Sequence, residues 1–174
     1  MTGPLVLPYR GILPRIAASA FIAPGAVIIG DVEIGERANI WFGCVLRGDV
    51  AAIRVGADTN LQDGTVVHVS TSKPPTVIGA RVTVGHMALI HACRLEDASF
   101  VGMKACVSDG AVVESGAMVA MGALVTPGKR VPAGELWGGN PARAMRPLRA
   151  EERDYIAELP GHYVELAAEY RDLR

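Results

Sequence analysis

The aliphatic residues of this chain recur every six positions. The repeat begins at Ile22 and ends at Val131, with a slip of three residues before Val55, an interruption across 70–77 and a deletion of one residue before Leu95. Eighteen positions carry it: 22, 28, 34, 40, 46, 55, 61, 67, 78, 84, 90, 95, 101, 107, 113, 119, 125 and 131. A period of six fits neither the 3.6-residue helix nor the two-residue alternation of an ordinary strand. It predicts short strands joined by tight corners.

Three such strands close one triangular coil, and coils stack by parallel strand pairing at ~4.8 Å. The eighteen units therefore predict an all-β fold, a parallel β-helix of about six triangular coils. We expect three regions: an N-terminal extension at 1–19, the hexapeptide-repeat β-helix at 20–135, and a linker with C-terminal helices at 136–174. The C-terminal spacing is that of an α-helical segment, and the Pro160-Gly161 pair predicts a break into two helices.

Composition narrows the class of protein. Half of the 174 residues are hydrophobic but only 5% are aromatic, as a narrow aliphatic core requires. No apolar run approaches the ~18 residues of a membrane span, so we expect no membrane association. The net charge of −1 does not indicate a nucleic-acid-binding protein. Three cysteines without a CxxC motif indicate reduced thiols and a cytoplasmic protein.

The repeat also predicts the side and the coil on which each outward residue lies. We name the three sides of the prism A, B and C, starting with side A at Ile22. On side B, the residues that follow the inward aliphatic positions are Ile29, Arg47, His68, His91, Ser108 and Thr126. Because strand side chains alternate, His68 and His91 should lie one coil apart on one face. A spacing of ~4.8 Å suits two imidazoles that converge on one metal at ~2.0–2.1 Å each.

His86 belongs to side A, one coil beyond Gln62 and Asp63, and therefore faces away from side B. A cyclic trimer resolves this separation, because side B of one subunit then meets side A of the next. Trp41 and Phe42 also project from side A, where exposed aromatic rings would gain from burial by a neighbour. We therefore expect a homotrimer with metal between its subunits.

The sequence resembles the γ-class carbonic anhydrases. The resemblance rests on RGD at 47–49, NLQDGTVVH at 60–68 and GHMALIH at 85–91, with GGNPAR at 138–143, and it covers about residues 10–173. It implies a left-handed β-helix that hydrates CO₂ reversibly to bicarbonate. It also implies that His68 and His91 of one subunit and His86 of its neighbour bind zinc, with iron or cobalt as alternatives.

The same resemblance implies roles for five further residues. Gln62, helped by Asn60, would hydrogen-bond the metal-bound water or hydroxide, while Arg47, Asp49 and Asp63 would form interface ion pairs that orient the site. The best-characterised pattern of the family has a Glu after the aspartate of the first motif and an acidic loop, both linked to proton shuttling. This chain has Val50 there and the loop STSKPPT at 70–76, so the resemblance does not extend to fast turnover.

Two other functions fit a hexapeptide repeat. Acyltransferases of this fold use one histidine as general base, with acyl-CoA bound between subunits. Other family members bind metal with little hydratase activity and serve in binding or assembly. Three histidines at this spacing favour the metal-dependent hydratase over both alternatives.

Overall fold

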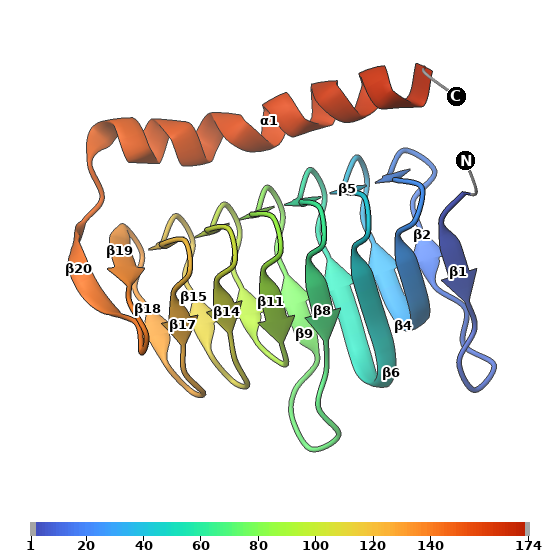
Figure 1. The fold of residues 1–174 in the computed structure, drawn as a ribbon, viewed down its shortest axis with the longest axis horizontal. Helices are drawn as coiled ribbons and strands as arrows, with labels where there is room; N and C mark the ends of the chain where they lie inside the picture. Colours follow the sequence, from blue (N-terminus) through green and yellow to red (C-terminus); the bar gives the residue numbers. More distant parts are fainter. Residues whose placement is uncertain (1–2, 173–174) are drawn as a thin grey trace.

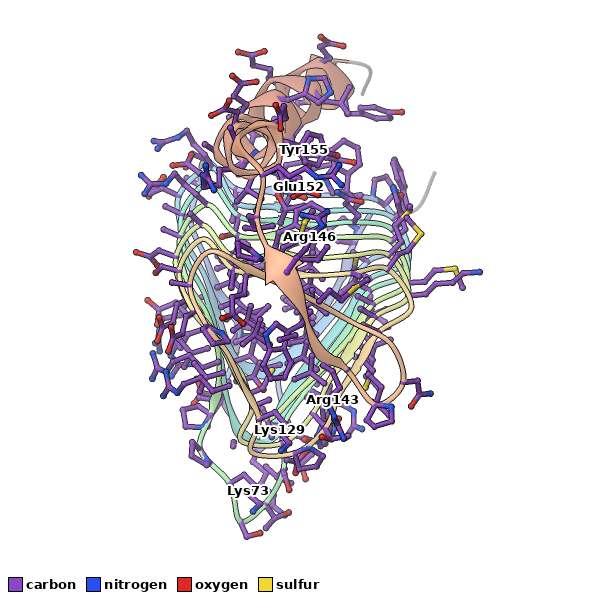
Figure 2. The ribbon with its side chains drawn as sticks, turned by 90° about the vertical axis from the view of Figure 1, so that its left-hand side faces the viewer. Lys73, Lys129, Arg143, Arg146, Glu152 and Tyr155 are labelled. Atoms are coloured by element: carbon purple, nitrogen blue, oxygen red, sulfur yellow. The ribbon has the colours of Figure 1, made fainter. Side chains whose placement is uncertain are left out.

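A triangular prism of stacked coils makes up most of the molecule, and one long helix lies along it. The computed structural model describes residues 3–172, and its parallel topology matches a left-handed β-helix. Helix α1 (Ala150–Asp172) runs back from the C-terminal end of the prism towards its first coils (Figure 1). Viewed along its length, the coils superimpose as a triangle, with Lys73 on a loop at the corner opposite α1 (Figure 2).

Side A is one sheet of seven parallel strands, with β20 (Arg143–Pro147) added at its end. In spatial order from the N-terminal end, the seven are β3 (Phe21–Ile22), β5 (Asn39–Ile40), β7 (Asn60–Leu61), β10 (Thr83–Val84), β13 (Phe100–Val101), β16 (Met118–Val119) and β19 (Glu135–Gly138).

Sides B and C form one continuous sheet because β4 (Val27–Ile34) and β6 (Val45–Val55) bend across the corner between them. The remaining strands of side B are β1 (Leu5–Leu7), β8 (Val66–His68), β11 (Leu89–His91), β14 (Cys106–Val107) and β17 (Leu124–Val125). Those of side C are β2 (Arg15–Ile16), β9 (Thr76–Ile78), β12 (Arg94–Leu95), β15 (Val112–Val113) and β18 (Arg130–Val131).

The core is the stack of inward aliphatic side chains that the repeat predicts. Ile28, Leu46 and Val67 are fully buried in successive coils of side B, and small residues such as Ala88 and Cys44 fill the corners. Burial raises the pKa of the Cys44 thiol to about 12. A core this narrow has room for one large and one small side chain per strand, which explains the scarcity of aromatic residues.

The prism has about seven coils, one more than the repeat count predicts. At the N-terminal end, β1 and β2 pair in parallel with β4, so part of the expected extension at 1–19 continues the prism. At the other end, β19 pairs in parallel with β16, and Trp137 stands opposite Val119. The aliphatic pattern does not predict this last coil, because its inward position is occupied by a tryptophan.

In the region after 135, where the sequence predicts a linker, the structure has the strands β19 and β20. β19 and β20 pair in antiparallel fashion and close the end of the prism. Within β20, Arg146 forms a bidentate ion pair with Glu152 in the first turn of α1. This pair fixes the point where the chain leaves the prism and the helix begins (Figure 2).

The expected break at Pro160 does not occur, and α1 is one continuous helix. Proline removes one helical hydrogen bond, but packing on both sides of it compensates. Ile156 packs with Leu136 and Leu148 before the proline, and Ala167 packs with Trp41 after it. Within residues 3–172, no helix combines the length and the apolar composition that spanning a membrane requires.

The same helix corrects the expectation for Trp41. Its ring is only 4% exposed in a single chain, because Tyr163 and Tyr170 of α1 cover it at centroid distances of 5.7 and 5.3 Å. Phe42 is partly buried in the same cluster. These aromatic residues therefore attach α1 to side A, and they give no support to an intersubunit contact.

We expect Gly56→Ala to destabilise the prism by about 1–3 kcal/mol. A β-carbon at this position would lie 2.5 Å from backbone atoms of Gly79 and Ala80 in the next coil. Gly161→Ala is the matched control, because a β-carbon added at this position of α1 would have no neighbouring atom within 4 Å. We expect this variant to raise the free energy of unfolding by about 1 kcal/mol. Denaturant unfolding measures both, and an unchanged free energy of unfolding for Gly56→Ala would contradict this packing.

Candidate metal centre

His68 and His91 lie side by side on side B. They end β8 and β11, and the strand register pairs them directly. Their ring centroids are 5.2 Å apart. The stacking that the six-residue repeat predicts for these two imidazoles is therefore present in the structure.

Each of the two imidazoles has one nitrogen facing the other ring and one nitrogen held by a carboxylate. His68 Nδ1 lies 3.2 Å from His91 Nε2. On the outer sides, His68 Nε2 is 3.1 Å from Asp49 Oδ1, and His91 Nδ1 is 2.6 Å from Asp109 Oδ1. A carboxylate accepts a hydrogen bond from the N–H of a neutral imidazole, and in that tautomer both inner nitrogens present lone pairs.

This donor set fits a divalent metal. Two nitrogens that are each ~2.0–2.1 Å from one tetrahedral ion lie ~3.3–3.4 Å apart, close to the separation of the inner nitrogens. Two lone pairs that face each other repel, and a cation between them removes that repulsion. Neutral imidazole suits zinc and iron among other first-row metals. His68 and His91 could therefore supply two of the ligands that such an ion needs.

Asp49 links the histidine pair to Arg47. Its side chain is only 13% exposed, pairs with Arg47 and also contacts His68. Burial by itself raises the pKa of the Asp49 carboxyl, but hydrogen bonds from His68 and Arg47 outweigh burial and leave the pKa below its ordinary value. Asp49 therefore stays ionised and can orient His68.

The second group of predicted residues lies on side A. His86 follows β10, and its Nδ1 is 2.8 Å from Asp63 Oδ2. Gln62 donates a hydrogen bond from Nε2 to Asn60 Oδ1 at 3.1 Å, and Asn60 in turn donates to Thr83. Gln62 and Asn60 are buried, whereas the His86 and Asp63 side chains are about two-fifths exposed at 42% and 43%.

One chain does not bring the two groups together. Arg47, Asp49, His68 and His91 belong to side B, and the other four belong to the neighbouring side. Among residues 3–172, no three histidine, cysteine or acidic side chains gather where they could jointly hold a metal ion. Each chain therefore presents two partial sites on adjacent sides of the prism.

Known proteins are similar to this chain over most of its length. The model of a family described as bacterial transferase hexapeptide (six repeats) matches residues 14–48. A relative from Geobacillus kaustophilus named carbonic anhydrase is 41% identical over 170 residues, which are 98% of this chain and 93% of the relative. Gamma carbonic anhydrase 2, mitochondrial, from Arabidopsis thaliana is 53% identical over 159 residues. The chain belongs to the γ-class carbonic anhydrase family.

The match to the plant γ-class protein covers 88% of this chain but only 57% of that relative's length. A solved structure of a hexapeptide transferase family protein from Anaplasma phagocytophilum superimposes with a TM-score of 0.92 and 49% identity. That match covers 95% of this chain and 98% of the other. The fold of this chain is therefore shared with a protein that is described as a hexapeptide transferase.

A groove of about 470 Å³ opens beside the side-A residues of this γ-class chain. Gln62 and His86 lie at one end, and Tyr163 of α1 lines it with them. Most of the remaining lining is apolar: Phe100, Met103, Met118, Met121, Leu136 and Leu159. Burial raises the pKa of the Tyr163 hydroxyl, which stays protonated at neutral pH.

Asp109 is the residue that sequence reasoning missed. It lies two positions after the inward Val107, so the repeat places it at a corner one coil beyond His91. The register between coils could have identified it, because a carboxylate beside the His68–His91 column in the following coil is close enough to reach the His91 ring.

Proposed function

We propose that this chain is a metal-dependent γ-class carbonic anhydrase that hydrates CO₂ reversibly to bicarbonate between the subunits of a homotrimer. The metal would be zinc, with iron or cobalt as alternatives, bound by His68 and His91 of one subunit and His86 of the partner subunit. The observation that carries the proposal is the pair of inner nitrogens, 3.2 Å apart, with both outer nitrogens held by carboxylates.

The trimer is supported by the two partial sites and by exposed apolar side chains around the corner between sides A and B. Val66 and Leu89 pair on side B, and both are exposed. Met87, next to His86, is 62% exposed, and Met121 is 69% exposed. Burial of this corner against side B of a neighbour would join His86 to the histidine pair and repeat three times around the axis.

A bound zinc ion supplies hydroxide at neutral pH, because it lowers the pKa of water from ~15.7 to ~7. The residues of the chain have supporting tasks. Asp49 and Asp109 orient the two imidazoles, and Arg47 holds Asp49. Asp63 orients His86 in the same way from side A.

Gln62 is suited to orient the nucleophile. Its Nε2 donates to Asn60, so its carbonyl oxygen is left to accept a hydrogen bond from a hydroxide at the site. The apolar groove beside Gln62 and His86 would admit CO₂, an uncharged molecule without a dipole, more readily than it would admit ions. Bicarbonate, the charged product, would leave towards solvent.

The three cysteines are free, and burial raises the pKa of the Cys93 thiol to about 12. Such thiols are typical of a reducing compartment, which supports a cytoplasmic location. The description of the similar solved structure favours a second candidate, a hexapeptide acyltransferase in which the carboxylate-held His91 would serve as general base. A third is a γ-class protein that binds metal without hydrating CO₂, which Val50 after Asp49 favours.

Stopped-flow CO₂ hydration with parallel metal analysis should separate these functions. We expect hydration in proportion to zinc content, loss on chelation and recovery on adding zinc. A zinc-loaded protein without hydration would point to the binding or assembly role. Metal-independent release of CoA from acetyl-CoA with an amine acceptor would instead identify an acyltransferase.

We expect His86→Ala to lose zinc while keeping the fold. The side chain points outward, and its pair with Asp63 is solvent-exposed, so its loss should cost less than about 1 kcal/mol of stability. His162→Ala, on the exposed face of α1, is the matched control and should retain zinc. Full zinc retention by His86→Ala, measured by metal analysis after dialysis, would remove His86 from the site.

A further inference from the structure

Asp109 is held rigidly at the corner between β14 and β15. Its carbonyl oxygen accepts a hydrogen bond from Gly128 N at 2.9 Å in the following coil. The next residue, Gly110, donates from its backbone nitrogen to Ala92 O at 2.7 Å in the preceding coil. The backbone on either side of the carboxylate is thus tied to both neighbouring coils, which fixes where the side chain starts.

The corner itself does not require an aspartate. The same backbone bonds show that Ala92 holds this position in the preceding coil and that Pro127 holds it in the following coil. Both coils make the corner without a polar side chain there. A turn preference alone therefore does not account for the carboxylate of Asp109.

The carboxylate has a defined partner. Asp109 Oδ1 lies 2.6 Å from His91 Nδ1, and the two side chains are only 26% and 31% exposed. The hydrogen bond from His91 is the main cause that holds the pKa of the Asp109 carboxyl below its ordinary value. Lys73, on the loop after His68, favours the ionised carboxylate as well.

We propose that Asp109 is a positioning residue that fixes the proton of His91 on Nδ1 and aims Nε2 at His68. With Asp49 it brackets the histidine pair, so that Asp49, His68, His91 and Asp109 form a ladder across four successive coils of side B. The inference rests on the proposed metal site, whose side-B half this ladder builds within one chain.

The ladder also sets the charge of the half-site. The carboxylates of Asp49 and Asp109 bring negative charge to both ends of the histidine pair, which would favour a divalent cation between the rings. Removal of a carboxylate that orients a metal-binding histidine usually weakens metal affinity by about 10–100-fold. Asp109 should therefore matter for metal binding although it does not touch the metal.

Zinc affinity of the full-length protein, measured by competition with a chromophoric chelator, tests the proposal. Asp109→Asn keeps the size and an acceptor oxygen but removes the charge, and we expect about 10–100-fold weaker zinc binding. Asp109→Ala removes both and should bind zinc more weakly still. The matched control is Asp97→Asn, an exposed aspartate at another corner that accepts from Ala80 N, and it should be unchanged.

A second readout uses the metal-free protein. Nitrogen-15 NMR of the imidazoles at about pH 8 reports which ring nitrogen carries the proton. We expect the Nδ1 proton on His91 in the parent protein and a shift of the proton towards Nε2 in Asp109→Ala.

The outcomes separate this inference from the proposed function. A parent protein that binds no zinc would overturn the proposed function, while the NMR measurement would still test Asp109. Unchanged zinc affinity and an unchanged His91 tautomer in both variants, with only a lowered unfolding midpoint, would overturn the inference. Asp109 would then serve the corner alone.

Discussion

Parallel backbone pairing between successive coils controls every other feature of the molecule. Each coil repeats the backbone of the one before it at ~4.8 Å, so each inward position must accept a side chain of the same size as its neighbours above and below. The interior admits Ile28, Leu46 and Val67 in line, with small residues at the corners. Where coils come closest, as at Gly56, even a β-carbon does not fit.

The same pairing places the chemistry on the outside. A residue on one coil has its partner on the next coil at a fixed distance, whatever their separation in sequence. His68 and His91 therefore meet although a loop separates them, and carboxylates from the coils on either side reach their outer nitrogens. The stacked coils thus hold the side chains of Asp49, His68, His91 and Asp109 in a line on the outer surface of the prism.

Much of this was predictable from the sequence, because a repeat converts spacing into position. The three sides, the inward residues and the stacking of His68 on His91 all follow from the period of six. The failures arose where a tertiary contact overrides a local signal. Trp137 occupies an inward position where the repeat predicts an aliphatic residue. Helix α1 continues through the buried Pro160 because the helix packs against side A both before and after the proline. The contact of Asp109 with His91 joins two coils, so it follows from the register between coils and from no pattern within one strand.

We propose that side B of one subunit and side A of the next together complete each metal site. Subunit complementation between His68→Ala and His86→Ala tests it most directly, since each variant retains the half-site that the other lacks. Each variant alone should form trimers without tightly bound zinc. After the two are unfolded and refolded together in equal amounts, random assembly should restore zinc and CO₂ hydration at about one quarter of the interfaces. A mixture that binds no more zinc than the separate variants would contradict a site shared between subunits.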